Sequence, residues 1–261
     1  MKDTLRISLI QAPIAWEGRK ANLDACARRL AALKGHTDIA VLPETFDTGF
    51  SMNPCLEAGA MDGETVSFLR ACAKDFDMAI AGSFIAGSGE GRRFNRGFII
   101  TPRGDNCYCD KRHLFGPGGE KDIFTAGKTR PVATYLGWRI CLQVCYDLRF
   151  PCWSRNTGGA YDLLVYVANW PASRIGAWDI LLPARAVENM AYVCGVNRTG
   201  VDGGGVVYCG HSAVYSPRGE VVAYAGDDGD CVLTASLDGA SLDGLRRKFP
   251  ALEDADRFGF L

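Results

Sequence analysis

The chain has 261 residues, with 29 basic and 30 acidic side chains and a formal net charge of -1. This balance excludes a strongly basic surface of the kind that binds nucleic acid or an anionic membrane, so we expect neither partner. No apolar run is long enough to predict a transmembrane helix, and the 48% of hydrophobic residues is enough to bury a substantial core.

The predicted elements mix strands and helices along the whole chain. In chain order they are a strand at 5–12, a helix at 22–33, a strand at 38–42, a helix at 64–76, strands at 78–85, 94–101, 106–110, 138–144 and 162–168, a helix at 177–192, strands at 192–197, 211–216, 220–224 and 231–236, and a helix at 242–249. Pro183 should kink the third helix or mark its start. Hairpins join several strands and no linker divides the chain, so we expect one domain over residues 1–261, an α/β sandwich of two sheets.

The chain has eleven cysteines but only three histidines. No export signal is visible at the N-terminus, so we expect a cytoplasmic protein whose cysteines are reduced thiols. The close pairs Cys107/Cys109 and Cys141/Cys145 lack the CxxC spacing of zinc sites. We therefore expect no metal site.

Three reactive residues, Glu44, Lys111 and Cys145, each lie at or just past the carboxyl end of a predicted strand, where α/β folds bind their ligands. Together they would make a hydrolytic site, because a thiolate attacks, a carboxylate moves protons and a cation stabilises an oxyanion. If each residue is considered alone, a non-catalytic explanation is favoured. Glu44 would be a solvated carboxylate, Lys111 a surface lysine and Cys145 one of several core thiols. Spacing alone does not bring the three together.

The same residues lie in three motifs: Leu42-Pro43-Glu44, Tyr108-x-x-Lys111-x-His113-Leu114-Phe115 and Cys145-Tyr146-Asp147-Leu148-Arg149-Phe150-Pro151. In type, order and separation these resemble the three signatures of the nitrilase (carbon–nitrogen hydrolase) superfamily, and the segment at 185–189 resembles a helix segment of that family. The resemblance implies a nitrilase-like α-β-β-α sandwich of two mixed sheets flanked by helices. Within the superfamily, the segments at 43–52 and 169–171 look most like the bacterial omega-amidases. That branch hydrolyses the terminal amide of 2-oxo dicarboxylic acid monoamides such as 2-oxoglutaramate and 2-oxosuccinamate.

The resemblance also implies roles for four residues. Cys145 would be the nucleophile, Glu44 the general base and Lys111 the partner of the oxyanion and of the thiolate. Glu120 matches the family's second glutamate. An ammonium favours a thiolate and a carboxylate accepts a proton, so we expect Lys111 and Glu44 to prepare Cys145 between them. The amide would be cleaved to the acid and ammonia through a thioester, without a metal or an organic cofactor.

Further residues are candidates for holding the substrate. The backbone N–H of Tyr146 would help to bind the oxyanion. Arg174 is the candidate for the distal carboxylate, with a surface arginine as the alternative, whereas Arg149 is expected to brace the loop after Cys145 through an ion pair. Three aromatic residues are candidates for the pocket wall, with a core role as the alternative for each: Phe46, Phe50 and Trp170.

Other interpretations stay open. The three motifs do not separate an omega-amidase from a nitrilase, an aliphatic amidase or an N-carbamoyl amide hydrolase. A papain-like hydrolase would pair Cys145 with His113 or His211, although His113 fits a structural hydrogen-bonding role better. A catalytically silent binding protein on the same fold is a further alternative. The family resemblance also predicts a homodimer.

Overall fold

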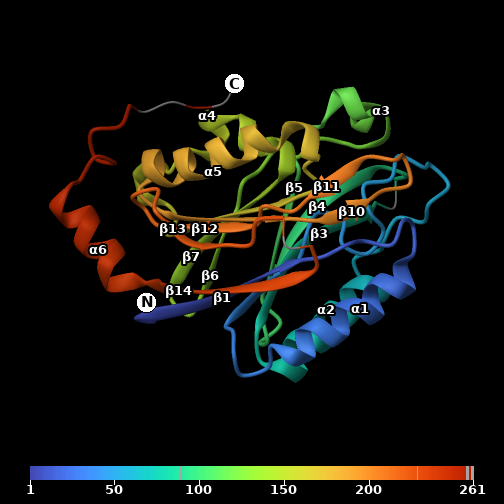
Figure 1. Cartoon of the computed structure of the whole chain (residues 1–261), viewed down its shortest axis with the longest axis horizontal. Helices are drawn as coiled ribbons and strands as arrows, with labels where there is room; N and C mark the ends of the chain where they lie inside the picture. Colours follow the sequence, from blue (N-terminus) through green and yellow to red (C-terminus); the bar gives the residue numbers. More distant parts are fainter. Residues whose placement is uncertain (89, 228, 257–258, 260–261) are drawn as a thin grey trace.

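Two six-stranded mixed sheets form the centre of the structure (Figure 1). It is a computed structural model that describes residues 1–88, 90–227, 229–256 and 259. The first sheet has the order β14 (Cys231–Asp238), β1 (Thr4–Gln11), β2 (Ile39–Val41), β3 (Ala79–Gly87), β4 (Arg93–Ile100) and β5 (Asn106–Asp110). The second has the order β13 (Val221–Tyr224), β12 (Ala213–Tyr215), β9 (Tyr192–Asn197), β8 (Leu163–Ala168), β7 (Trp138–Val144) and β6 (Val132–Tyr135). A separate short hairpin pairs β10 (Thr199–Val201) with β11 (Val207–Cys209).

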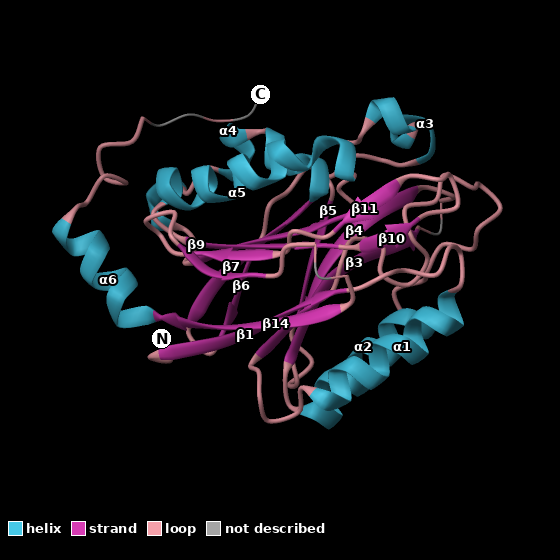
Figure 2. Cartoon of the chain, viewed as in Figure 1, coloured by secondary structure: helices cyan, strands magenta, loops and turns pink. Residues whose placement is uncertain are grey.

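Helices cover the outer faces of the two sheets (Figure 2). The first sheet carries α1 (Arg19–Ala32) and α2 (Glu64–Phe76), and the second carries α4 (Pro151–Ser154) and α5 (Ile175–Asn189). A single turn, α3 (Glu120–Ile123), lies near the site described below, and α6 (Gly239–Lys248) follows β14. This arrangement confirms the predicted α-β-β-α sandwich. Among the described helices, none combines the length and the apolar character that a membrane span requires.

The side chains of β1 show that the first sheet packs against a separate apolar cluster on each of its two faces. Leu5, Ile7 and Leu9 alternate along the strand and pack into the cluster shared with the second sheet. Ile10 points the other way and packs with residues of α1 and α2. Side chains alternate across a strand, so a sheet that is apolar on both faces must be covered on both.

The strand directions decide which loops meet. β2 and β3 are parallel, β4 is antiparallel to both its neighbours β3 and β5, and so β2 and β5 run the same way. In the second sheet β7 and β8 are parallel. The carboxyl ends of parallel strands lie at one edge of a sheet. The residues that follow β2 and β5 therefore share an edge, as do those that follow β7 and β8.

Several elements differ from the sequence-based predictions. β6 and the β10–β11 hairpin were not predicted, because they are three or four residues long and too exposed for a clear alternation. Helix α5 runs from Ile175 to Asn189 with Pro183 inside it, so the expectation that Pro183 marks the start is wrong. The helix ends earlier than expected, at Asn189, and Met190, which follows it, has a left-handed φ of 45°.

Gly195 lies on β9 where α5 packs closely on the second sheet. A Cβ at this position would lie 2.5 Å from Leu182 Cδ1 and 2.7 Å from Trp178 Cζ2. Both neighbours are fully buried side chains of the helix, so they have little room to move.

We expect Gly195→Ala to lower the free energy of unfolding by about 1–3 kcal/mol, because overpacking a core forces side chains from their preferred positions. The measurement is urea denaturation followed by circular dichroism. Gly176→Ala on the same helix is the control, since nothing lies within 4 Å of its added methyl group. It should leave the stability unchanged or raise it by up to about 1 kcal/mol. Equal effects of the two substitutions would contradict this account of the packing.

Candidate active site

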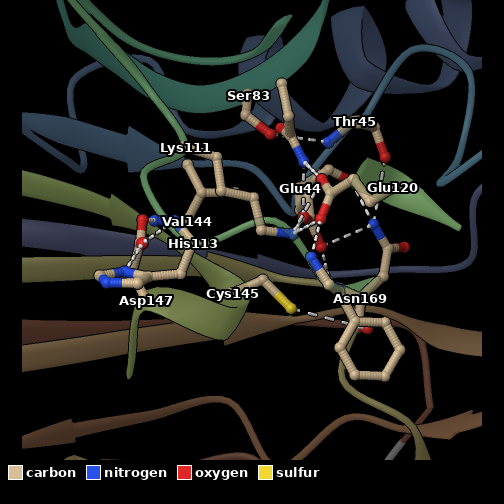
Figure 3. Close-up of polar contacts among 12 residues, drawn as sticks. Glu44, Thr45, Ser83, Lys111, His113, Glu120, Val144, Cys145, Asp147 and Asn169 are labelled. Carbon is tan, nitrogen blue, oxygen red and sulfur yellow. Dashed lines mark hydrogen bonds and ion pairs between the residues drawn. The ribbon is translucent and has the colours of Figure 1, made fainter. Parts of the chain in front are cut away.

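Glu44, Lys111 and Cys145 meet in one cavity although they come from three separate stretches of the chain (Figure 3). Glu44 lies in the loop after β2, and Lys111 directly follows β5 of the same sheet. Cys145 directly follows β7 of the second sheet. All three line a cavity of about 560 Å³ between the ends of the two sheets. The strand directions thus bring these three residues together, which their spacing in the sequence did not predict.

A buried ion-pair cluster surrounds Lys111. Its Nζ lies 2.9 Å from Glu44 Oε1 and 2.9 Å from Glu120 Oε2, and the side chains of all three are 0% exposed. A Phe50 ring lies 5.0 Å from the same Nζ. Burying charge is costly unless it is paired, and here one cation faces two carboxylates. The ammonium is therefore held by charge at a fixed point beside the thiol of Cys145.

Two asparagines that the sequence analysis did not assign to the site fix the orientation of the carboxylates. Asn95 on β4 donates from Nδ2 to Glu44 Oε1 at 2.7 Å and to Glu120 Oε1 at 3.1 Å. Asn169, which follows β8, donates its backbone N–H to Glu44 Oε2 at 2.7 Å. Both oxygens of Glu44 are thus occupied by fixed donors. An asparagine inside a strand has no motif of its own, so the only available signal was a polar residue at a buried position.

The backbone at Cys145 is strained and is held by a carboxylate. Cys145 has a φ of 48°, which is unusual for a residue with a side chain, and it begins a 3₁₀ turn at Cys145–Arg149. Asp147 in this turn accepts hydrogen bonds from the backbone N–H groups of Val144 at 3.1 Å and His113 at 2.9 Å. Asp147 therefore ties the turn that presents the thiol to the segment that carries Lys111.

The electrostatics favour the protonated thiol in the unliganded protein. Burial and the Glu44 carboxylate raise the pKa of Cys145 well above its usual value, and the Lys111 ammonium opposes them only in part. Burial would lower the pKa of Lys111, but the carboxylates of Glu120 and Glu44 outweigh it and raise that pKa. Burial also raises the pKa of Glu120, against the pull of Lys111. The Lys111 ammonium thus favours the thiolate, whereas the Glu44 carboxylate opposes negative charge on the sulfur.

Four of the five predicted substrate-binding residues line the cavity: Phe50, Tyr146, Trp170 and Arg174. Phe46 does not line it. Its ring is 4% exposed and packs at 5.9 Å from the Phe98 ring in the core under α1 and α2. The side chain that follows Glu44 by two residues thus faces the helices and not the cavity, and its predicted role is corrected here.

The mouth of the cavity carries two arginines. The Arg174 guanidinium lies 5.0 Å from the Phe115 ring and that of Arg149 lies 5.1 Å from the Trp170 ring. Both side chains belong to exposed residues that line the cavity. No described carboxylate forms an ion pair with Arg149, so the expected brace through an ion pair is not found. Both cations are free to meet an anion.

A further part of the cavity wall comes from segments that the sequence analysis left unassigned. Trp16 lies in the loop before α1, and Asp202 and Tyr208 belong to the β10–β11 hairpin. The Tyr208 hydroxyl donates to Asp202 Oδ2 at 2.8 Å, which stiffens the hairpin. No pattern in the sequence indicated that this hairpin reaches the cavity.

Neither histidine of the papain-like alternative lines the cavity. His113 Nδ1 lies 2.8 Å from Asp147 Oδ1, and its ring stacks on Phe150 at 3.7 Å. His211 lies in another part of the molecule, between carboxylates described below. Among the residues that line this cavity, Cys145 has acid and amine neighbours but no imidazole.

Comparison with known proteins identifies the family. The family described as carbon-nitrogen hydrolase matches residues 6–247. The chain belongs to the carbon-nitrogen hydrolase family. It is 44% identical over 254 residues to omega-amidase YafV of Escherichia coli strain K12, covering 97% of this chain and 98% of the relative. This membership makes the protein a hydrolase of carbon–nitrogen bonds and confirms the resemblance found in the three motifs.

Two further relatives agree with this family. The chain is 29% identical over 252 residues to 2-oxoglutaramate amidase of Bacillus subtilis strain 168, covering 95% of this chain and 96% of the relative. The solved structure of XC1258 from Xanthomonas campestris matches with a TM-score of 0.96 and 41% identity over 99% of both chains. XC1258 is a CN-hydrolase superfamily protein with an arsenic adduct in its active site.

The charge around the thiol of this hydrolase gives a pH-dependence prediction. Glu44→Gln removes the nearby negative charge that raises the pKa of Cys145, so the apparent pKa of this thiol should fall. The measurement is the rate of alkylation by iodoacetamide against pH, with the Cys145 peptide followed by mass spectrometry. Cys152, an exposed thiol, is the internal control and should titrate alike in both proteins. An unchanged or higher apparent pKa at Cys145 would contradict the electrostatic account.

Proposed function

We propose that this carbon–nitrogen hydrolase is an omega-amidase. Its substrates would be small 2-oxo dicarboxylic acid monoamides, 2-oxoglutaramate and 2-oxosuccinamate, cleaved to the acid and ammonia through a Cys145 thioester. The observation that carries the proposal is the buried Lys111 ammonium between Glu44 and Glu120, next to the thiol in one cavity. The names of the Escherichia coli and Bacillus subtilis relatives support the substrate class.

The proposed first half-reaction is attack of sulfur on the amide carbon. The thiol is protonated at rest, so Glu44 takes its proton as the carbon–sulfur bond forms. The Lys111 ammonium and the Tyr146 backbone N–H stabilise the oxyanion that forms on the carbonyl oxygen. Glu44 then passes the proton to the nitrogen as the carbon–nitrogen bond breaks. Ammonia leaves and a thioester remains on Cys145.

The proposed second half-reaction is hydrolysis of the thioester. Glu44 takes a proton from a water molecule as its oxygen attacks the thioester carbon, with the oxyanion bound by the same donors. The carbon–sulfur bond breaks, the proton returns to the sulfur, and the acid leaves. Glu120 does not transfer a proton in this scheme. It holds the Lys111 ammonium in place through the ion pair of 2.9 Å.

The two arginines at the cavity mouth support a substrate with a distal carboxylate. Arg174 and Arg149 are exposed residues that line the cavity, while the side chains of Glu44 and Lys111 in the same cavity are fully buried. A guanidinium binds a carboxylate through two parallel hydrogen bonds. A substrate with an amide at one end and a carboxylate at the other therefore matches the charge distribution along the cavity. We assign Arg174 as the main carboxylate ligand.

Loss of the nucleophile tests the proposed function. We expect the wild-type protein to release ammonia from 2-oxoglutaramate and Cys145→Ala to release none, because no thioester can form. Circular dichroism and thermal unfolding of the variant serve as the control for folding. Full activity of Cys145→Ala would overturn the mechanism. Turnover of an N-carbamoyl amino acid, a nitrile or a simple aliphatic amide, without turnover of 2-oxo amides, would reassign the substrate within the superfamily.

Arg174→Met tests the carboxylate contact separately from the chemistry. Loss of a hydrogen-bonded charge pair is worth about 1.5–3 kcal/mol, so kcat/KM for 2-oxoglutaramate should fall by about 10- to 150-fold. The loss should appear mainly in KM. A short neutral aliphatic amide that the enzyme turns over slowly is the matched control, because it has no carboxylate to lose. Equal losses on both substrates would show that Arg174 shapes the cavity instead of binding the carboxylate.

We also propose a homodimer, formed through a surface that we name the dimer face. It consists of exposed apolar side chains on α5 and on the neighbouring edge strand β13: Ile180, Val187, Val221 and Val222. Val187 lies beside the turn before β13, since a Cβ on Gly219 would be 2.8 Å from Val187 Cγ2. Exposed apolar side chains gathered on a protein surface mark an interface, and an edge strand favours pairing with another strand.

Ile180→Asp should convert the proposed dimer to a monomer. Ile180 is 69% exposed in the single chain but would be buried in the proposed interface, where an unpaired charge is costly. The mass in solution is measured by light scattering after size exclusion. Leu136→Asp lies in the turn after β6, at the opposite edge of the same sheet, and is the control that should stay dimeric. A monomeric wild-type protein would end this proposal.

The compartment is proposed to be the cytoplasm. Cys107 and Cys109, which are close in sequence, are both free thiols in the structure. Free thiols persist in a reducing compartment, whereas oxidising compartments convert them to disulfides. A cysteine nucleophile also needs a reduced thiol to act.

A further inference from the structure

A second cluster of reactive side chains lies away from the Glu44–Lys111–Cys145 cavity. The ligand atoms of Cys209, His211 and Asp227 all lie within 4.8 Å of one another. Cys209 is the last residue of β11, His211 follows two residues later, and Asp227 comes from the loop after β13. None of the three lines the catalytic cavity described above. Three different atom types, sulfur, nitrogen and oxygen, thus converge from two loops.

The backbone holds the two loops together. His211 donates its N–H to the Gly226 carbonyl at 3.0 Å, which places the imidazole beside Asp227. Gly210 has a φ of 81°, and a Cβ there would lie 2.3 Å from the Gln11 side chain. His211 itself has a φ of 62°. Two successive left-handed residues therefore turn the chain sharply between the thiol and the imidazole.

The two nitrogens of His211 have different partners. Nε2 lies 2.9 Å from Oδ1 of Asp227, one of the other two residues of the cluster. Nδ1 lies 2.9 Å from Asp179 Oδ1 on α5 and 2.8 Å from the Tyr224 hydroxyl. A carboxylate that accepts the proton of one imidazole nitrogen leaves the lone pair on the other nitrogen, which is the arrangement found behind metal-binding histidines.

We propose that Cys209, His211 and Asp227 bind one divalent cation of the zinc class, with Asp179 as a positioning residue for the imidazole. Thiolate, imidazole and carboxylate together are the ligands that zinc uses, and three protein ligands leave one position for water. Ligand atoms around tetrahedral zinc lie roughly 3.3 to 3.6 Å apart, as its bond lengths require. The 2.9 Å pair of His211 and Asp227 needs to open only slightly to admit the ion. Asp227 can move, because its side chain is 78% exposed.

A cation bound at Cys209, His211 and Asp227 would affect the substrate cavity through the β10–β11 hairpin, which forms part of the cavity wall. Cys209 ends the strand that carries Tyr208, and Tyr208 lines the cavity together with Asp202. A cation bound at Cys209 would fix the end of this hairpin to the loop after β13. We therefore place its role in the structure of the cavity wall and not in the reaction. The proposal does not depend on the proposed substrate.

The test uses cobalt as a spectroscopic probe and zinc as its competitor. The Cys145→Ala protein is stripped with a chelator and titrated with Co²⁺, so that the catalytic thiol cannot contribute. We expect one equivalent to bind with a thiolate-to-cobalt absorption band, and one equivalent of Zn²⁺ to displace it. Cys209→Ser should lose the band, whereas Cys55→Ser, at an exposed thiol, should keep it.

Two further variants keep the test independent of folding. Asp227→Asn changes an exposed side chain and should weaken zinc binding at least tenfold without unfolding the chain. Asp179→Asn should weaken it by about 10- to 100-fold, as loss of an outer carboxylate does. Zinc should raise the Tm of the Cys145→Ala protein but not of Asp227→Asn in the same background. Binding of less than one equivalent, or a cobalt band that persists in Cys209→Ser, would overturn the proposal and leave an ordinary imidazole–carboxylate ion pair.

Discussion

The site depends on one interaction, the contact of the Lys111 ammonium with the carboxylates of Glu44 and Glu120. All three side chains are fully buried, so each would be unstable there without the others. Removing one partner of such a buried pair typically costs about 3–5 kcal/mol. The same contact that stabilises the buried charges also places an ammonium and a carboxylate beside the Cys145 thiol. Stability and chemistry therefore require the same geometry at this point.

The asparagines around the cluster show how neutral groups complete it. Asn95 donates to an oxygen of each carboxylate, Glu44 Oε1 and Glu120 Oε1. The backbone N–H of Asn169 donates to the other oxygen of Glu44, Oε2. Asn95 thus adds a second donor to oxygens that Lys111 also contacts, and Asn169 supplies donors to the Glu44 oxygen that Lys111 does not contact. Since Glu44 is held from both sides, its carboxylate has a defined position in the unliganded protein, as the proposed proton transfer requires.

The fold class and the meeting of Glu44, Lys111 and Cys145 in one cavity could be predicted from the sequence, but for different reasons. The long strands and helices follow from hydrophobic periodicity, whereas Glu44, Lys111 and Cys145 were identified by motifs and not by any property of the individual residues. Asn95 was missed because its role comes from the register of β4 against its neighbours, which a single sequence does not contain. The prediction that Phe46 lines the cavity was wrong for a related reason, since the sequence does not show whether an aromatic side chain after Glu44 faces the cavity or the core. The short strands of the β10–β11 hairpin are set by tertiary contacts and not by local preference.

The two sheets contribute different parts of the centre. The loops after β2 and β5 supply the acid and the amine, and the loop after β7 supplies the sulfur. The apolar layer between the two sheets therefore also fixes the position of the Cys145 thiol relative to the Glu44 carboxylate. A small slip of one sheet across the other would separate sulfur from carboxylate while leaving both layers folded. Under the proposed mechanism, the rate of turnover is therefore more sensitive to a small shift between the two sheets than circular dichroism, which reports only the secondary structure.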